Sequence, residues 1–493
     1  MLITVGTYLK FSISHELPPK GCDEFGYLQL AEAFNQDKAY TDLVERSYLS
    51  GLKDTLEKEN ILPQLYQWMI TPHAYHFSGN GNQIINQYAP GTSWILGFFS
   101  TDLRQKVFPA FIMLFTLLIP VLLMKWSNKF KPEEIYTTMI VLSVFAVVIS
   151  LAPPFHIEVG RINSLALTFF LLITAGILHQ RNTAWSIVLI AISANFRLVN
   201  LLTLLPFIFV LWNPFINHVK AKDWKSALLF IFKHLALVFI PLIPYMLYAY
   251  QLLGNPFSVT YSTIDTAFAQ GNEFIQNLFF YFDPTEAWFH IHLISLVGII
   301  ILNRVFKEKL TPAQWGLIIT LPILNYAFFM THKVQINYYP YGSGMLLLGI
   351  LIGMLAQRFS YKGKFIGLIA LPSILALVLF IDGVNRFSSK DHISWNEALK
   401  QHGELCEYDV VWSDIYSGTT EYVCGNYGFV MHAGSVKSRI IAWQYLHNHQ
   451  YKQVLLLEDT PLPLNQLEKE LELSKLNYKL ITLKEFGNAV VIE

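Results

Sequence analysis

The sequence predicts a polytopic α-helical membrane protein with a large first extracytoplasmic loop and a small C-terminal α/β domain. Only 14% of the 493 residues are charged and 53% are hydrophobic, whereas soluble domains normally carry about 25% charged residues. The apolar residues are gathered into long runs, and several reach the length of about 20 residues that a membrane span needs. Residues 383–493 lack such runs and alternate between short strand-like and helix-like segments.

We predict a transmembrane domain over residues 1–382 with about eleven spans. The clear apolar runs are, in chain order, residues 107–124, 135–152, 162–179, 234–253, 288–303, 314–331, 340–356 and 365–382. A shorter run at residues 2–14 is interrupted by Lys10 and counts as a partial span. The stretch 183–212 is too long for one ordinary span, and Asn195, Phe196 and Arg197 interrupt it near its middle. We therefore predict that it forms two short helices arranged as a hairpin.

Basic residues set the orientation of the spans, because cytoplasmic loops carry an excess of lysine and arginine. One set of loops is rich in these residues: Lys125, Lys129, Lys131, Arg181, Lys220, Lys222, Lys225, Lys233, Arg304, Lys307, Lys309, Arg358, Lys362 and Lys364. The short loops on the opposite side carry Arg161, Arg197 and Lys333. We therefore place the first set in the cytoplasm. The first loop, residues 15–106, and the C-terminal domain, residues 383–493, are then extracytoplasmic.

The C-terminal domain is predicted to have strands at residues 409–412, 453–458, 479–483 and 488–492 and amphipathic helices at 439–449 and 466–476. It also contains Cys406 and Cys424, which could form a disulfide outside the cytoplasm or remain two unpaired core thiols. No Asn-x-Ser/Thr sequon occurs in the chain, which favours the inner (cytoplasmic) membrane of a bacterium over a secretory-pathway membrane. The charges balance at 35 basic and 35 acidic residues, so nothing indicates nucleic acid as a partner.

Two adjacent carboxylates, Asp23 and Glu24, lie just after the first apolar segment. Carboxylates at a membrane surface are costly to desolvate, so they indicate either chemistry or a structural cap. As a cap, Asp23 would precede a helix over residues 24–34, with Glu24 in its first turn. As a catalytic group, Asp23 would be a general base that takes a proton from an acceptor hydroxyl.

Four short motifs are similar to those of a known superfamily. The run Asp23-Glu24-x-x-Tyr27-x-x-x-Ala31 resembles the first-loop motif of the GT-C membrane glycosyltransferases, which include protein O-mannosyltransferases and the bacterial aminoarabinose transferase of lipid A. The segment 87–92 (Gln-Tyr-Ala-Pro-Gly-Thr) is similar to their Tyr-Pro-Pro-Gly element, with Ala89 in place of the first proline. The runs 160–163 (Gly-Arg-Ile-Asn) and 194–197 (Ala-Asn-Phe-Arg) are also similar to patterns of that group. The resemblance covers most of the chain, although the short first span departs from it.

The resemblance implies a GT-C-like fold and an inverting enzyme. Such an enzyme moves a sugar from a polyprenyl-phosphate donor to a hydroxyl of a lipid, glycan or protein acceptor. The resemblance makes Asp23 the catalytic base, and Glu24 would orient the acceptor or hold a neighbouring group. Cations are needed where charge develops on the leaving phosphate, and the candidates in the outer loops are Arg161, Arg197 and Lys333. The residues that would support these groups from beside the site are Glu158, Tyr27, Tyr88 and Tyr338.

Some of these residues also have a simpler structural explanation. Arg161 and Lys333 could snorkel to the membrane interface, Glu158 could pair with Arg161, and Tyr338 could belong to an aromatic belt. Arg197 is harder to explain in this way, because a charge between two apolar helices is expensive unless it is paired.

No metal site is assigned from the sequence. His73 and His76 form a His-x-x-His pair, but no third ligand accompanies it. A divalent cation stays compatible with the proposed chemistry.

Two other functions stay open on the sequence alone. A transporter or flippase for lipid-linked saccharides would share the many spans, but it is expected to place ionisable residues near the middle of the bilayer and often to show inverted repeats. A non-catalytic assembly subunit would tolerate the substitution Asp23→Asn.

Overall fold

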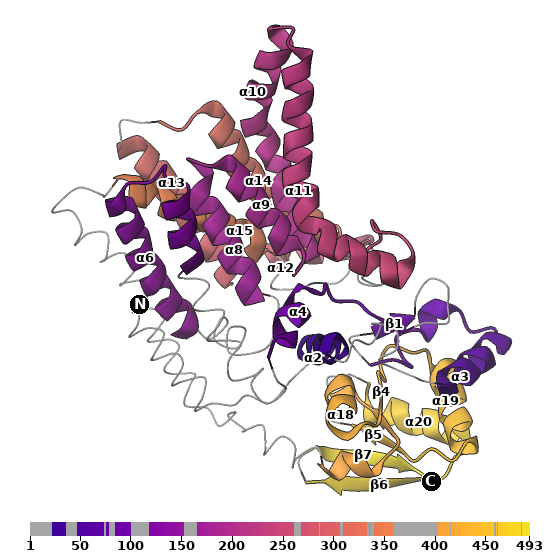
Figure 1. The fold of residues 1–493 in the computed structure, drawn as a ribbon. Helices are drawn as coiled ribbons and strands as arrows, with labels where there is room; N and C mark the ends of the chain where they lie inside the picture. Colours follow the sequence, from indigo (N-terminus) through magenta and orange to yellow (C-terminus); the bar gives the residue numbers. More distant parts are fainter. Residues whose placement is uncertain are drawn as a thin grey trace.

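The computed structural model of the chain describes residues 22–35, 47–72, 75–77, 84–99, 118–151, 165–260, 268–284, 286–305, 309–332, 335, 340–358, 403–414, 416–457, 460, 462–484 and 486–493. Within these residues the chain forms an apolar helical part and a smaller α/β part. Helix α2 (Cys22–Asn35) lies between the two parts (Figure 1).

Four helices of the described chain are long and apolar enough to cross a membrane, fewer than the eleven or so spans that we predicted. They are Leu198–Lys220, Trp224–Leu253, Trp288–Val305 and Pro312–Met330. Three shorter apolar helices accompany them: Leu167–His179, Thr183–Ala194 and Tyr341–Gln357. The predicted runs at 2–14 and 365–382, and most of 107–124, lie outside the described residues. The structure therefore supports a membrane protein without showing the predicted number of spans.

The apolar part is a bundle of helices, several of which expose large hydrophobic side chains. In chain order they are α6 (Pro132–Leu151), α8 (Leu165–His179), α9 (Thr183–Ala194), η2 (Leu198–Phe207), α10 (Ile208–Lys220), α11 (Trp224–Leu253), α12 (Asn272–Tyr281), α13 (Ala287–Val305), α14 (Pro312–Met330) and α15 (Tyr341–Arg358). On α11, Phe232 is 65% exposed, Ile240 64% and Leu247 59%. Soluble proteins rarely expose such a continuous apolar surface. An apolar surface of this kind is expected where a helix faces lipid.

The predicted break in the stretch 183–212 is confirmed. Helix α9 ends at Ala194, η2 begins at Leu198, and the two segments pack against each other. The second arm is longer than predicted, because the chain stays helical through α10 to Lys220. Helix α10 then lies against the first half of α11, and these two helices extend beyond the rest of the bundle (Figure 1).

Two loops that we predicted to be cytoplasmic meet at one end of the bundle. The guanidinium of Arg181 donates to the Glu134 carboxylate at 2.6 Å and to the backbone carbonyl of Lys129 at 2.8 Å. Lys129 Nζ donates in return to the carbonyl of Arg181 at 3.2 Å. These reciprocal contacts place both loops on the same side of the helices, as the distribution of basic residues predicts.

Helices α8 and α15 approach so closely that glycine is required at their interface. A Cβ at Gly349 of α15 would overlap the backbone carbonyl of Ile173 on α8, and one at Gly176 would overlap the carbonyl of Leu346. Small residues let backbones pack closely in membranes, where hydrophobic burial does not drive helix association. These glycines therefore fix the α8–α15 contact.

The C-terminal part is the predicted α/β domain. Its strands are β3 (Val410–Trp412), β4 (Tyr427–Phe429), β5 (Gln453–Leu456), β6 (Tyr478–Leu483) and β7 (Gly487–Ile492), in the sheet order β4-β3-β5-β7-β6. Its helices are η3 (Gly403–Glu407), α18 (Ser417–Cys424), α19 (Val436–Asn448) and α20 (Leu464–Ser474). Strand β3 is parallel to β4 and β5, whereas β7 is antiparallel to β5 and β6. We did not predict α18 and β4, because α18 begins with weak helix formers and β4 has only three residues, with Gly428 at its centre.

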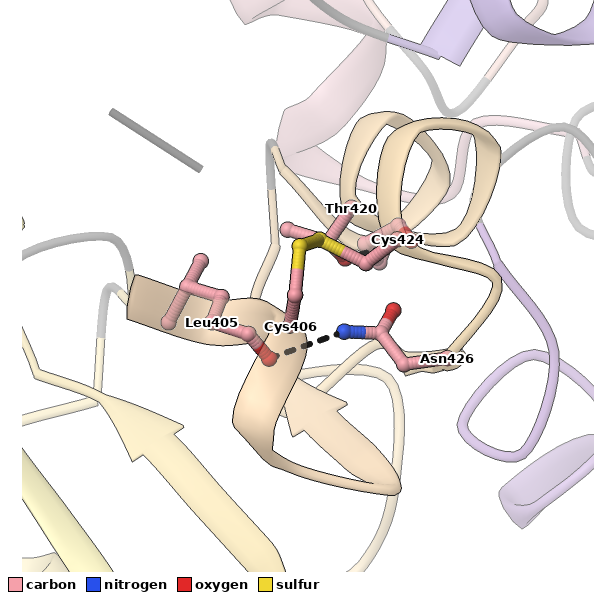
Figure 2. The surroundings of a disulfide bond; sticks show 6 residues. Leu405, Cys406, Thr420, Cys424 and Asn426 are labelled. Carbon is pink, nitrogen blue, oxygen red and sulfur yellow. Dashed lines mark hydrogen bonds between the residues drawn. A yellow bond between two sulfur atoms is a disulfide. The ribbon is translucent and has the colours of Figure 1, made fainter. Parts of the chain in front are cut away.

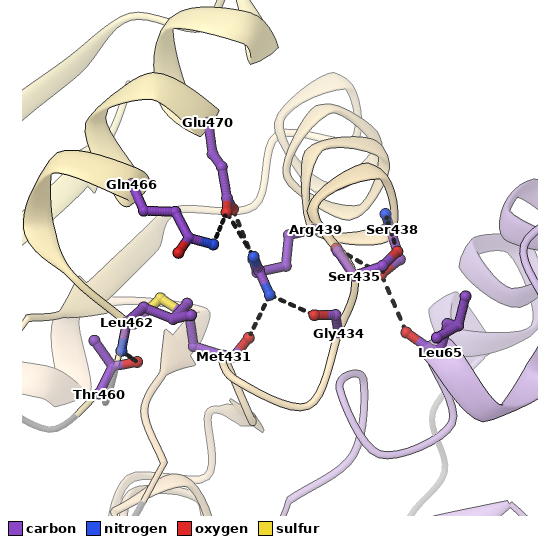
Figure 3. A network of polar contacts seen from close by, with 10 residues as sticks. All are labelled: Leu65, Met431, Gly434, Ser435, Ser438, Arg439, Thr460, Leu462, Gln466 and Glu470. Atoms are coloured by element: carbon purple, nitrogen blue, oxygen red, sulfur yellow. Dashed lines mark hydrogen bonds and ion pairs between the residues drawn. The ribbon is translucent and has the colours of Figure 1, made fainter.

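A segment of the first loop belongs to the same hydrophobic core as the C-terminal domain. Leu52 and Leu56, on α3 (Ser47–Lys58), are buried in one cluster with Trp443 and Leu446 of α19. The chain then passes through η1 (Pro63–Leu65), where the carbonyl of Leu65 accepts a hydrogen bond from Ser438 (Figure 3). This segment of the first loop and the C-terminal domain therefore fold as one unit.

One buried ion pair joins two helices of this unit. Arg439 on α19 donates through Nε and Nη2 to the carboxylate of Glu470 on α20, at 2.7 and 2.6 Å (Figure 3). Both side chains are 2% exposed. Removing one partner of such a pair strongly destabilises the fold, because the other charge is left buried and unpaired.

Candidate functional site

Helix α2 carries the Asp23-Glu24 pair and is buried along much of its length. The helix already includes Cys22, so Asp23 lies inside its first turn and not at the predicted N-cap position before residue 24. Glu24 is 5% exposed, and Phe25 and Tyr27 are 1% exposed. The helix therefore begins two residues earlier than predicted, and both roles considered for Asp23, cap and catalytic base, stay predictions.

The second motif packs directly against α2. The ring centroids of Tyr27 and Tyr88 lie 5.1 Å apart, so α2 contacts the segment 87–92. Asn86 strengthens this contact: its side-chain amide donates to the carbonyl of Gly26 at 2.9 Å, and its side-chain oxygen accepts from the backbone of Tyr88 at 2.9 Å. Two of the sequence motifs are thus joined by a residue, Asn86, that no motif includes.

The second motif also meets the break between α9 and η2. The backbone N–H of Gly91, the first residue of α4 (Gly91–Gly97), donates to the carbonyl of Asn195 at 2.9 Å. A Cβ on Gly91 would lie 2.7 Å from that carbonyl oxygen and 3.0 Å from the Phe196 ring. Only glycine lets the two segments approach so closely, so the glycine of this motif has a structural reason.

Asn195 also enters the hydrogen-bond ladder of α11. Its side-chain NH₂ donates to the carbonyl of Pro241 at 2.8 Å, and its side-chain oxygen accepts from the N–H of Tyr245 at 3.0 Å. In a regular helix this carbonyl and this N–H would bond to each other. Pro241 and Pro244 lie inside α11, and prolines open a helix ladder so that a side chain can enter it. Asn195 therefore ties the α9–η2 break to α11.

The meeting point of α2, the segment 87–92 and the α9–η2 break is called the junction below. Arg197 lies beside it, at the start of η2. It is 4% exposed and has the extended backbone of an N-cap residue. Its burial fits the expectation that a charge between apolar helices is held by its surroundings. Arg161, Lys333, Glu158 and Tyr338 lie outside the described residues, so their predicted roles stay predictions.

The junction contains buried polar atoms that could bind a ligand. Gln87 Oε1, Thr92 Oγ1 and Ser93 Oγ are buried and have no hydrogen-bond partner in the part of the chain that the structure describes. Buried polar groups are normally satisfied. All three belong to, or directly follow, the motif that packs against α2.

The loop after α11 covers the same region. Thr260 donates through Oγ1 to the carbonyl of Gln87 at 2.7 Å, and its own carbonyl lies 2.7 Å from His76 Nε2. His76 is on strand β1 (Tyr75–Phe77), which pairs with β2 (Ile84–Asn86). His73, its partner in the His-x-x-His pair, is outside the described residues, and those residues contain no group of three or more side chains suited to a metal.

The C-terminal domain closes over α2 from the opposite side. Gly418 on α18 packs against the ring of Phe25, with no room for a side chain. A disulfide between Cys406 and Cys424 ties α18 to η3, and Asn426 donates to the carbonyl of Leu405 at 3.2 Å beside it (Figure 2). The bond closes a loop with a sequence separation of 18, for which the chain-entropy model gives about 3 kcal/mol. Of the two alternatives for these cysteines, the disulfide is the one that the structure contains.

The structure thus brings three of the sequence motifs together: residues 23–27, 87–92 and 194–197. Comparison of the chain with models of protein families, with curated proteins and with solved structures found no match. The function is therefore inferred from the residues and their arrangement. Asn86 and Thr260 were not predicted, because each makes a contact with a residue more than 50 positions away.

Proposed function

We propose that the protein is an inverting glycosyltransferase of the GT-C type that uses a polyprenyl-phosphate-linked sugar on the extracytoplasmic face of a bacterial inner membrane. The observation that carries this proposal is the convergence of the carboxylate-bearing helix α2, the segment 87–92 and the Asn195–Arg197 break. The junction lies at the end of the apolar helices nearest the α/β domain (Figure 1). A donor with a lipid tail and a polar head would reach such a junction from the membrane.

The proposed reaction is a single displacement. The oxygen of the acceptor hydroxyl attacks the anomeric carbon, the bond from that carbon to the phosphate oxygen breaks, and polyprenyl phosphate leaves with the bonding electrons. Asp23 takes the proton of the hydroxyl. Glu24, one residue further along α2, orients the acceptor.

Arg197 is proposed to stabilise the charge that develops on the phosphate, together with Arg161 and Lys333. A cation is most effective in such a role when it is held in place and shielded from water. The burial of Arg197, at 4% exposure, supports this assignment. Tyr27 and Tyr88, whose rings are in contact, hold α2 and the segment 87–92 in register.

The test is sugar transfer by the full chain in proteoliposomes. A panel of radiolabelled polyprenyl-phosphate sugars is offered with envelope extract as the acceptor, to the wild type, to Asp23→Asn and to Glu32→Gln. Glu32 is a matched control, because it lies on the same helix and is partly buried. Loss of a general base lowers the rate by about 10²–10⁴-fold, so Asp23→Asn should lose transfer while Glu32→Gln keeps it.

Each alternative gives a different result in this assay. Equal transfer by the wild type and Asp23→Asn would exclude Asp23 as the base. Movement of intact donor across the bilayer, without transfer to any acceptor, would identify a flippase. The third outcome is that the protein neither transfers sugar nor moves donor, while other proteins form a complex only when it is present. That outcome would identify an assembly subunit.

A further inference from the structure

The C-terminal domain has the topology of a ligand-binding sheet. Strand β3 lies between β4 and β5 and is parallel to both. The chain leaves β3 through α18 to reach β4 on one side, and returns through α19 to β5 on the other side. In open parallel sheets, ligands bind at the carboxyl ends of the strands where the connections diverge in this way. This point is the carboxyl end of β3.

An Asp-His pair occupies that edge of the sheet. Asp414 follows β3 by two residues and His432 follows β4 by three. His432 Nδ1 lies 2.7 Å from Asp414 Oδ1, and the backbone N–H of His432 donates to the same oxygen at 3.1 Å. The side chain of Asp414 is 6% exposed and that of His432 is 42% exposed. A buried carboxylate therefore orients an imidazole that is partly exposed to solvent.

Residues near this pair contact the first loop and helix α2. The backbone N–H of Val430, two residues before His432, donates to the carbonyl of Met69 in the first loop at 2.9 Å. After strand β3, helix α18 begins three residues beyond Asp414, and Gly418 of α18 packs on Phe25 of α2. Phe25 is two residues from Asp23. The pair thus lies where the C-terminal domain meets the helix of the proposed base.

We propose that the Asp414–His432 pair binds hydroxyl groups of the acceptor, and that the acceptor is a saccharide. This inference rests on the proposed function. An imidazole held by a carboxylate can hydrogen-bond to hydroxyl groups, which both donate and accept.

The local charges favour a neutral, hydroxyl-rich acceptor over an anionic one. Asp414 supplies a buried carboxylate to this edge of the sheet. Arg439, which follows His432 on the next helix, is 2% exposed and its charge is directed to Glu470. An acceptor that presents phosphate would need an accessible cation at this edge. His432 is therefore a positioning residue for a sugar hydroxyl, while Asp23 remains the proposed base.

The test compares His432→Ala, His432→Gln and His449→Ala in the full chain. The bond from the backbone of residue 432 to Asp414 survives all substitutions of the side chain, so the strand ends stay joined. Glutamine retains a side-chain donor and acceptor. His449 is an exposed histidine on the same domain, and its Nδ1 contacts only the backbone of Tyr445 among the hydrogen bonds of the described chain.

Two measurements are made on each variant. The first is the dependence of transfer on the concentration of envelope saccharide, with the donor that the wild type uses. The second is direct binding of the same saccharide to the chain in lipid nanodiscs, by saturation-transfer NMR without any donor. We expect His432→Ala to raise the acceptor KM and the dissociation constant by about tenfold, the effect of one lost hydrogen bond at a well-formed site. The kcat and the donor KM should not change, His432→Gln should recover part of the loss, and His449→Ala should match the wild type.

The two measurements separate failure of this inference from failure of the proposed function. Equal saccharide binding by the wild type and His432→Ala would overturn the inference, whatever happens to transfer. Binding that depends on His432 in a chain that transfers no sugar would support the site and reject the glycosyltransferase. An equal fall of kcat in both His432 variants, with the acceptor KM unchanged, would also overturn it, because that is the result of a structural defect.

Discussion

The insertion of Asn195 into α11 makes a sharp prediction about membrane-domain stability. Asn195 is 6% exposed and bonds both the Pro241 carbonyl and the Tyr245 N–H through its side-chain amide. Asn195→Ala removes both hydrogen bonds and leaves the Pro241 carbonyl and the Tyr245 N–H without the amide. A buried hydrogen bond contributes about 1 kcal/mol and an unsatisfied buried group costs about 1–3 kcal/mol, so we expect a loss of roughly 2–4 kcal/mol.

Asn195→Asp should be more harmful than Asn195→Ala. Aspartate keeps the acceptor for the Tyr245 N–H, but it places a second acceptor against the Pro241 carbonyl where the amide donates. If it ionises, it also leaves a charge in an apolar environment. Alanine, in contrast, lets α11 straighten so that the Tyr245 N–H and the Pro241 carbonyl pair with each other, which offsets part of the loss.

The assay is reversible unfolding of the full chain in bilayers, combined with hydrogen exchange of α11. Asn200→Ala is the matched control, because Asn200 is also buried but donates one hydrogen bond, to the Ser193 carbonyl at 3.1 Å. We expect the loss to increase from Asn200→Ala to Asn195→Ala to Asn195→Asp, with faster exchange of the α11 amides in Asn195→Asp than in the wild type. The reasoning is refuted if Asn195→Asp is as stable as the wild type and the exchange of α11 does not change.

Two further perturbations follow from the packing of the other parts. Gly349→Ala should destabilise the helical part by about 1–3 kcal/mol, because the new methyl group overlaps the Ile173 carbonyl. Gly342→Ala, on the same helix, should not destabilise it, since the nearest neighbour of the new methyl group would be 3.5 Å away. The melting temperatures of the two variants would show the difference. Burial, together with the hydrogen bond that Tyr66 donates to Glu57 at 2.8 Å, raises the pKa of the Tyr66 phenol above its ordinary value of 10.0. The folded chain then keeps this proton to higher pH than the unfolded chain, so stability is full below that value and falls as the pH rises above it. Denaturant unfolding between pH 8 and 11 should show a shallower alkaline decline for Tyr66→Phe, and an identical decline in both proteins would contradict this assignment.

Several features could be predicted from the sequence because they depend on local pattern. The break at residues 195–197 follows from polar residues within an apolar run, and helix α9 ends at Ala194 accordingly. The meeting of the loops around Lys129 and Arg181 follows from the distribution of basic residues. For the number of spans, four qualifying helices lie within the described residues, against the eleven or so that the sequence predicts.

The composition and periodicity of the chain by themselves determined an apolar helical part, an α/β domain and the presence of the motif residues 23–27, 87–92 and 194–197. Only the tertiary structure decided how these parts are joined. Asn195 enters α11, Leu52 and Leu56 complete the core around Trp443, and Asp414 meets His432 at the edge of the sheet. The physical reason is the range of the interactions. Helix and strand patterns arise between residues a few positions apart, whereas these contacts depend on packing between segments that are far apart in the chain.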